Sequence, residues 1–273
     1  MRVALCCLAK NEELYINDFI KWYLDIGVDK IYIYDNNDIN KSDSLEKAIS
    51  PNLLSKCEII NVRGQSDKGF QQKIYTNFYN QYKDTFDWCL FVDIDEYLMG
   101  IKDIKSYFSI LPFHRYNQVR IKWKLFGDDE LIERDMSKPV YNVFKKELNT
   151  SLHRNLVKQG NLEKQGKCIV RGGLKHIKFN SVHFANYTNG FMLESCLPNG
   201  MYCYSKVVLN EPYNCGIYLY HYMTKTISEF INQKLNRNDA VYNTSIKLDY
   251  FWRINKKTQE KLDYINKKLG TQE

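Results

Sequence analysis

The chain has 273 residues, of which 44% are hydrophobic and 26% are charged. This length and composition suffice for one large folded unit, and they exclude a disulfide-stapled miniprotein, a globally disordered chain and a collagen-like repeat. Lys and Arg number 39 against 32 Asp and Glu, and the resulting net charge of +7 favours anionic partners. Nucleic acid is not expected among them, because the sequence has no zinc-finger spacing, ribonucleoprotein motif or dense basic helix.

The first hundred residues predict β-α units. Short apolar runs alternate with amphipathic stretches, which is typical of a mostly parallel sheet flanked by helices. We expect strands at 3–8, 31–34, 57–62 and 88–92, and helices at 14–26 and 70–82. The fold class predicted from this order is α/β.

After residue 100 the pattern becomes less regular. Short strands are expected at 118–125, 167–170, 181–184 and 216–221, and helices at 226–237 and about 250–269. No repeat or linker divides the chain, so we predict one continuous globular unit with halves at 1–100 and 101–273.

Cysteine usage and hydropathy bear on location. The eight cysteines contain no C-x-x-C pair, and several lie in apolar runs, as free thiols do in a reducing compartment. No window approaches the roughly 18–20 apolar residues of a membrane span, and Met1 directly precedes an apolar strand, so we expect a cytoplasmic protein. The Lys-rich stretch 255–268 indicates either a solvated helix face or a peripheral contact with an anionic membrane.

The strongest candidate site follows the fourth expected strand. Asp93 and Asp95 come directly after the buried run 88–92. In an extended segment their side chains project to the same side, so both carboxylates could face one hard cation that also binds a diphosphate. The cofactor expected here is Mn²⁺ or Mg²⁺. The alternative is a solvated turn before the next helix.

Several short stretches, taken in chain order, resemble the bacterial family-2-like and family-92 glycosyltransferases of the GT-A fold. They are Ala9–Glu12, Tyr34–Asn36, Asp93–Tyr97, Trp123–Gly127 and His221–Thr226 with Glu229–Phe230. The resemblance implies a Rossmann-like nucleotide-sugar half over 1–100 and an acceptor half over 101–273. It further implies metal-assisted, hexosyltransferase-like transfer from a nucleoside diphosphate sugar such as a UDP-sugar to a glycan or lipid-linked acceptor, in bacterial surface polysaccharide synthesis.

The resemblance also implies site residues. The donor-binding set is Lys10, Asn11, Glu12, Asp35, Gln72, Asp93 and Lys225, and the metal-binding set is Asp93, Asp95 and a histidine of the second half, His221 or His183. Each has a structural alternative: Asn11 and Glu12 could cap the following helix, Gln72 could be an ordinary surface residue, and either histidine could be a packed core residue. His114, His153 and His176 have no assigned role.

An inverting transfer needs a general base. Trp123 offers an aromatic platform for a sugar, and acids follow it at Asp128 and Asp129, which are the catalytic candidates. An acidic surface loop is the alternative, and a retaining mechanism would need no such base.

Other activities lack their motifs. No G-x-G-x-x-G follows the first strand and no G-x-S-x-G occurs, and the stretch 160–167 departs from a phosphate loop in spacing and in its final residue. The remaining alternatives are a nucleotidyltransferase and a catalytically inert glycan- or nucleotide-binding protein.

Overall fold

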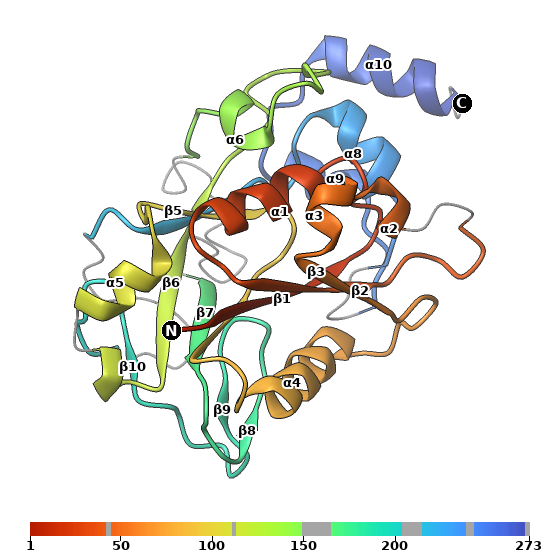
Figure 1. Cartoon of the computed structure of the whole chain (residues 1–273). Coiled ribbons are helices and arrows are strands. Elements are labelled where there is room, and N and C mark those ends of the chain that lie inside the picture. The colour runs from red at the N-terminus through yellow and green to blue at the C-terminus, as the bar shows by residue number, and fades with distance from the viewer. Residues whose placement is uncertain (42–44, 111–112, 149–164, 204–214, 239–242, 271–273) are drawn as a thin grey trace.

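The computed structural model describes residues 1–41, 45–110, 113–148, 165–203, 215–238 and 243–270. One large sheet runs through it, with helices on both faces (Figure 1). The first part of the sheet is built from β1 (Val3–Ala9), β2 (Lys30–Asp35), β3 (Cys57–Asn61) and β4 (Trp88–Phe91). These strands pair in parallel, with β3 and β2 on one side of β1 and β4 on the other. The predicted α/β class is confirmed.

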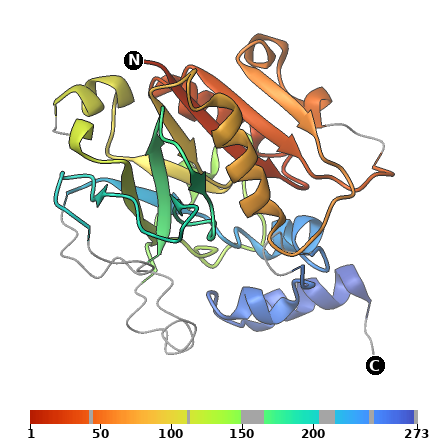
Figure 2. The same ribbon diagram turned by 90° about the horizontal axis from the view of Figure 1, so that it is seen from below.

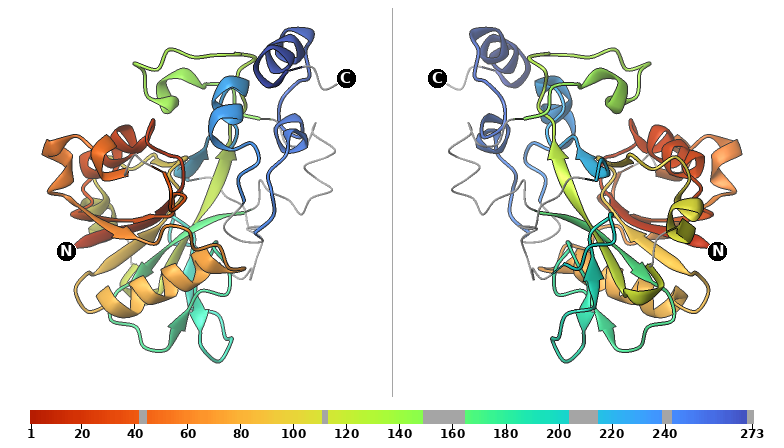
Figure 3. Two further views of the ribbon diagram at one scale, coloured as in Figure 1. Left: turned by 90° about the vertical axis from the view of Figure 1, so that its right-hand side faces the viewer. Right: turned by 90° about the vertical axis from the view of Figure 1, so that its left-hand side faces the viewer.

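Two helices cover opposite faces of β1. Val3, Leu5 and Cys7 pack in one core with α1 (Ile16–Asp25), whereas Ala4 and Cys6 pack in a second core with α4 (Phe70–Tyr82). Successive side chains of a strand point to opposite faces, so a strand covered on both faces is apolar throughout. Figure 3 shows α4 on one side of the sheet and α1 on the other.

The chain after β4 extends the same sheet. The order across it is β3-β2-β1-β4-β7-β6-β11-β5, with β10 paired to β6. The added strands are β5 (Glu96–Met99), β6 (Gln118–Leu125), β7 (Gly166–Arg171), β10 (Ser195–Cys196) and β11 (Tyr218–His221). β7 is antiparallel to both β4 and β6, so the sheet is mixed beyond β4. The division into halves at residue 100 stays a prediction.

Smaller elements complete the described chain. Two short strands, β8 (Ile177–Lys178) and β9 (Asn186–Tyr187), form a separate hairpin. The remaining helices are α2 (Leu45–Ala48), α3 (Pro51–Leu54), α5 (Ile104–Ile110), η1 (Phe113–Arg115), α6 (Val140–Val143), α8 (Ile227–Gln233), α9 (Leu248–Trp252) and α10 (Gln259–Leu269). Seen from below in Figure 2, α4 crosses the sheet and the C-terminal helices lie at one edge of the molecule.

Three expectations about elements need correction. The stretch 181–184 is not a strand but a series of bends, in which the Ser181 hydroxyl accepts a hydrogen bond from the His183 amide. The helix expected over about 250–269 is two helices, because Thr258 caps the start of α10 by accepting from the Lys261 amide. The helix expected over 226–237 ends at Gln233.

Two further observations concern the helices and the cysteines. None of the helices in the described ranges has an apolar stretch long enough to cross a membrane. The eight cysteines, all of which the structure describes, are free thiols.

Candidate active site

A cavity of about 450 Å³ lies at the carboxyl ends of β1 and β4. β1 pairs with β2 as far as Ala9 but with β4 only as far as Cys6, so the chains diverge beyond Cys6 and a crevice opens between them. Lys10 and Asp93 line the two sides of this crevice. The strand order reverses here, and open α/β sheets bind their ligands at such a point.

The opposite wall comes from later segments. Lys167 on β7, Trp123 on β6 and His221 at the end of β11 all line the cavity. The chain after β11 is tied to the acidic segment, because the Tyr222 amide donates to the Asp95 carbonyl at 2.9 Å. The same chain segment therefore carries His221 and, through α8, Lys234 to the acids.

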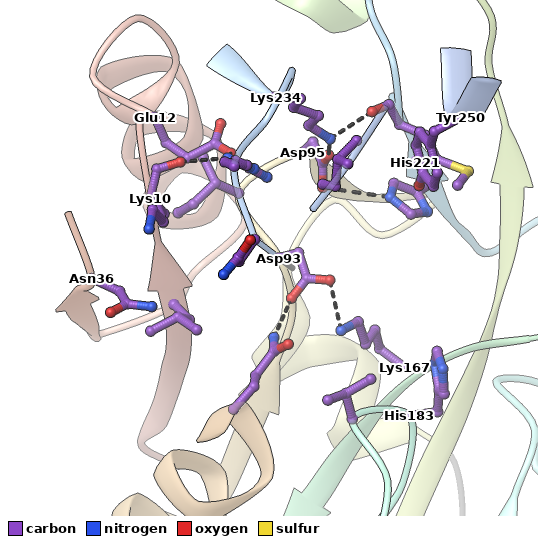
Figure 4. Close-up of a pocket in the computed structure, with 18 of the residues that line it drawn as sticks. Lys10, Glu12, Asn36, Asp93, Asp95, Lys167, His183, His221, Lys234 and Tyr250 are labelled. Atoms are coloured by element: carbon purple, nitrogen blue, oxygen red, sulfur yellow. Dashed lines mark hydrogen bonds and ion pairs between the residues drawn. The ribbon is translucent and has the colours of Figure 1, made fainter. Parts of the chain in front are cut away.

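Asp95 holds two partners, one on each carboxylate oxygen (Figure 4). Lys234 Nζ donates to its Oδ2 at 2.5 Å, and His221 Nε2 lies 3.5 Å from its Oδ1. The residue is only 6% exposed. Burial alone would raise the pKa of Asp95, but the Lys234 charge and the interaction with His221 outweigh it and hold that pKa well below its ordinary value. Asp95 is therefore an ionised, buried carboxylate.

Asp93 has different partners. Gln71 Nε2 donates to its Oδ1 at 2.6 Å, and Lys167 Nζ lies 2.8 Å from its Oδ2. Burial raises the pKa of Asp93, and the Lys167 charge more than offsets this, so the net shift is downward. For Lys167, burial lowers the pKa, and attraction to Asp93 and Glu96 brings it above the ordinary value. Both members of the pair are charged.

The two acids do not lie on an extended segment as expected. The chain turns between them, since the Glu96 amide donates to the Asp93 carbonyl at 3.0 Å. Each carboxylate accordingly faces its own lysine, as Figure 4 shows. The acids nevertheless reach one cavity, because the turn sits at the crevice between β1 and β4.

Glu96 lies beneath this pair and is fully buried. Its Oε2 accepts from the Asp93 amide at 2.8 Å, and its Oε1 lies 4.0 Å from His221 Nδ1. Neither Glu96 Oε1 nor His221 Nδ1 has a hydrogen-bond partner among the described residues. Burial raises the pKa of Glu96 well above its ordinary value. Glu96 thus supports the turn from inside.

The side chains of Asp95 and His221 could supply two ligands to a hard divalent cation. Asp95 Oδ1 and His221 Nε2 are 3.5 Å apart, a distance that two metal–ligand bonds of about 2.1 Å can span. Within the described ranges, no group of three or more His, Cys, Asp and Glu side chains is arranged to hold a metal ion. A cation held here would therefore take further ligands from a substrate, as Mg²⁺ does when it binds one or two carboxylates and a phosphate.

The structure gathers part of the predicted site. The predicted residues that line the cavity are Lys10, Glu12, Asp93, Asp95, Trp123, His183 and His221. Asn11, Asp35, Gln72 and Lys225, predicted to bind the donor, are not part of its lining.

Those four side chains have other partners or surroundings. The Asn11 side chain donates to the Gln233 carbonyl, and Asp35 pairs with Arg63 at 2.9 Å. Gln71 rather than Gln72 faces the cavity, since the neighbouring positions of α4 point in different directions. Lys225 is 2% exposed, with its Nζ 4.0 Å from the centre of the Tyr15 ring.

The predicted bases also lie elsewhere. Asp128 is buried and forms an ion pair with Lys261 of α10. Asp129 accepts from the backbone amides of Lys145 and Lys146, the shortest contact being 2.7 Å. Neither carboxylate lines the cavity. Their assignment as the general base stays a prediction.

His183 lies beside Lys167 and apart from Asp95 (Figure 4). Its Nδ1 is 2.9 Å from the Gly166 carbonyl, which can only accept, so Nδ1 carries the proton and Nε2 holds the lone pair. Burial, with the Lys167 charge, lowers the pKa of His183 to about 4. The ring also contacts Trp123, with 5.2 Å between centroids. His183 is thus a neutral hydrogen-bond acceptor on the Trp123 side of the cavity.

The basic lining was missed in the sequence. Lys167, Lys234 and Arg237 all line the cavity, and none was predicted to do so. One signal was available, because Lys167 begins the apolar run of β7, where a charge would be buried. Lys234 and Arg237 follow the end of α8, and their sequence alone does not distinguish them from solvated lysine and arginine.

Comparisons with known proteins agree with the motif resemblance. No protein-family profile matches the chain. A glycosyltransferase family 92 protein of Oryza sativa subsp. japonica is 23% identical over 130 residues, which are 46% of this chain and 21% of that protein. The chain thus spans about a fifth of the length of this relative. The expected similarity to family-92 glycosyltransferases is confirmed.

Loose similarity to solved structures was also found. S. aureus TarS 1–349 has a TM-score of 0.40 at 14% identity, covering 85% of this chain and 62% of that chain. The complex of TarS 1–349 with UDP-GlcNAc has a TM-score of 0.36 at 17% identity, covering 49% of this chain and 37% of that chain.

Proposed function

We propose that this protein is a metal-dependent glycosyltransferase of the hexosyltransferase type. It would move a sugar from a nucleoside diphosphate sugar, such as a UDP-sugar, to a glycan or lipid-linked acceptor in bacterial surface polysaccharide synthesis, with inversion at the anomeric carbon. One observation carries the proposal: Asp93, Asp95 and His221 share a cavity at the sheet's switch point with four buried or half-buried cationic side chains. The similarity to a family 92 glycosyltransferase adds to it.

The basic side chains suit a diphosphate. Lys167 and Lys234 line the cavity opposite β1, with Arg237 close by on the chain after α8. Charged donors bind phosphate oxygens through short, strong hydrogen bonds. On the other side, Leu8, Glu12 and Asn36 would surround the nucleoside. The leaving diphosphate would therefore lie between the ends of β1 and α8.

The cation would be held by Asp95 and His221, with Asp93 nearby. When bound, Mn²⁺ or Mg²⁺ neutralises charge that develops on the leaving diphosphate. The chain's own part is to keep Asp95 ionised and to orient His221. Buried Glu96 supports the turn between the two acids from below by accepting from the Asp93 amide, and its Oε1 faces His221 Nδ1 at 4.0 Å.

The acceptor would bind on the Trp123 side. Trp123 lines the cavity beside the neutral His183, and together they present an aromatic surface with a hydrogen-bond acceptor to a sugar. Asp128 and Asp129 remain the proposed bases. Geometry without substrate does not exclude them, because catalytic hydrogen bonds often form only in the substrate complex.

Membrane contact is the second part of the proposal. Lys261 is paired with Asp128 and Lys256 with Glu130, which leaves Lys257 and the last turn of α10 for an anionic surface. Such contact is weak and screened by salt. Flotation with anionic vesicles should show binding at low salt that is lost at high salt, and no binding at low salt would reject the membrane role.

Hydrolysis of a radiolabelled panel of nucleotide sugars, with Mn²⁺ and without acceptor, tests the activity. We expect slow sugar release from at least one donor, and none in EDTA. Nucleotide transfer from a nucleoside triphosphate to a sugar phosphate would indicate a nucleotidyltransferase instead. Binding of nucleotide sugars with no turnover, even when candidate acceptors are added, would indicate an inert binding protein.

A further inference from the structure

The ammonium group of Lys234 is buried in direct contact with the carboxylate of Asp95. Its Nζ lies 2.5 Å from Asp95 Oδ2 and 2.5 Å from the Met223 carbonyl, and the residue is 7% exposed. His221 Nε2 faces the other oxygen of the same carboxylate. A buried monovalent cation therefore already sits on the carboxylate that, on the proposed function, would hold a divalent one.

The fold places Lys234 there through α8. Thr226 and Glu229 form a capping box that fixes where the helix begins, and the Lys234 amide bonds to the Phe230 carbonyl where it ends. His221 lies just before this helix and Lys234 just after it. Both partners of Asp95 are thus carried by one short stretch of chain.

Lys234 has one acidic partner within ion-pair distance among the described residues, Asp95. Among the other charged groups that act on it, Arg237 and Lys225 repel it, and Glu12 attracts it from farther away. Glu12 already pairs with Arg237 at 3.3 Å. A Lys234 displaced from Asp95 would therefore be a buried charge without an ion-pair partner, which is strongly unfavourable.

We propose, on the basis of the proposed function, that Lys234 competes with the divalent cation for Asp95 and moves to the donor diphosphate when both ligands bind. The cation displaces the ammonium from Asp95, and the diphosphate provides the negative charge that the ammonium then needs. Neither ligand alone satisfies every charge. Cation and nucleoside diphosphate must then bind cooperatively, and each raises the affinity for the other by the same factor.

Binding of Mn²⁺ measured by the electron paramagnetic resonance of the free ion tests this, with and without UDP. For the wild type, UDP should tighten Mn²⁺ binding by at least about fivefold, the lower end of typical coupling between sites. Lys234→Gln keeps a hydrogen-bond donor and removes the charge. This variant should bind Mn²⁺ alone at least about fivefold more tightly than the wild type, and UDP should tighten it less.

Lys10→Gln is the matched control. It removes one positive charge from the same cavity, but Lys10 pairs with the exposed Asp38 at 2.9 Å and not with Asp93 or Asp95. Its affinity for Mn²⁺ alone should stay at the wild-type value. An equal gain in Mn²⁺ affinity in Lys234→Gln and Lys10→Gln would overturn the proposal. The loss of one positive charge anywhere in the cavity would then explain the gain.

The measurements distinguish failure of the role of Lys234 from failure of the proposed function. Wild-type protein that binds Mn²⁺ and UDP, together with a folded Lys234→Gln that binds Mn²⁺ no more tightly than the wild type, contradicts the role of Lys234 and leaves the proposed function standing. Wild-type protein that binds neither UDP nor any nucleotide sugar contradicts both. If thermal unfolding shows that Lys234→Gln is not folded, Lys234→Met, which removes the charge and keeps a long side chain, carries the same two expectations.

Discussion

Lys167 and Lys234 are almost fully buried, and each lies against one aspartate. Burying a charge is costly, and a buried ion pair is often no more stabilising than a well-packed apolar pair. Their presence in a core otherwise rich in aromatic and aliphatic side chains therefore points to binding rather than to stability. Both ammonium groups could therefore bind an anionic ligand with little rearrangement of the cavity.

Asp95→Asn should have two effects. Sugar transfer should fall by at least about 10², since the cation site loses its charged ligand. Stability should fall by about 3–5 kcal/mol, because Lys234 is left buried without a counter-charge. Hydrolysis of the nucleotide sugar and thermal unfolding measure the two effects separately. Full metal-dependent turnover in this variant would show that Asp95 does not hold the metal.

Asp38→Asn is the control for that substitution. Asp38 also pairs with a lysine of the cavity, Lys10, but its side chain is 71% exposed. Exposed ion pairs contribute at most about 1 kcal/mol. A large loss of stability in Asp38→Asn would mean that charge removal, and not burial, governs the effect at Asp95.

The carboxylates could be predicted from the sequence and the lysines could not, for a physical reason. Asp93 and Asp95 directly follow a buried strand, and the ends of parallel strands meet at one edge of the sheet. Lys234 reaches them from a part of the chain 139 positions away. Only the packing of α8 against the acidic turn brings the two together, and a single sequence does not reveal that packing.

At the scale of the element, α8 depends on a buried carboxylate. Glu229 pairs with Arg134 at 2.7 Å, accepts from the Tyr15 hydroxyl at 2.9 Å and completes the capping box with Thr226. Burial raises the pKa of Glu229, while the Arg134 and Lys225 charges more than offset this, so the net shift is downward. The folded state therefore favours ionised Glu229 more than the unfolded chain does.

Glu229→Gln should reveal this through its pH dependence. A carboxyl group whose folded pKa is lowered stabilises the fold above its unfolded pKa, about 4.3, and loses that contribution as the pH falls through the folded value. The difference in unfolding free energy between wild type and variant should be greatest near pH 7 and should narrow below about pH 4. Urea unfolding at several pH values measures it. A difference independent of pH would contradict the assignment.

The ion pair between Asp128 and Lys261 connects α10 to the loop after β6. Asp128→Asn should cost about 3–5 kcal/mol, since Lys261 is 1% exposed and would lose its counter-charge. Asp129→Asn should cost much less, because its acceptors serve exposed backbone amides. Hydrogen exchange in α10 and chemical unfolding measure the contrast. Equal effects in the two variants would show that the pair does not hold the helix.

The same two variants test the predicted base. Loss of a general base lowers kcat by about 10²–10⁴ and leaves donor binding intact. Normal kcat in both, measured on folded protein, would exclude Asp128 and Asp129 from that role.

The predicted helices and strands differ from the structure where contacts between distant parts of the chain outweigh the local sequence pattern. The strand β5 begins at Glu96, in a stretch where no strand was predicted, and it forms because β11 pairs with it in antiparallel register. The bends at 181–184 have a strand-like composition but no strand partner in the described chain. The chain between α9 and α10, where Thr258 caps the start of α10, is also held by Asn255, which donates to Thr224 and accepts from the Asp128 amide. These are long-range contacts.

At the scale of the whole molecule, the first half could be predicted better than the second. The parallel order around β1 follows from buried apolar runs alternating with amphipathic helices, and both signals are local. β6, β7 and β11 join the sheet out of chain order, so their neighbours could not be inferred from spacing. These three strands complete the cavity, because they place Trp123, Lys167 and His221 beside the acids.

A crystal structure of the protein with UDP and Mn²⁺ would show directly where the nucleotide and the cation bind. We expect the diphosphate in the cavity between β1 and α8, in contact with Lys234, and the metal ion bound to Asp95 and a phosphate oxygen. Nucleotide bound at another surface, or a cavity in which Lys234 still lies on Asp95 while UDP and Mn²⁺ are present, would contradict this expectation.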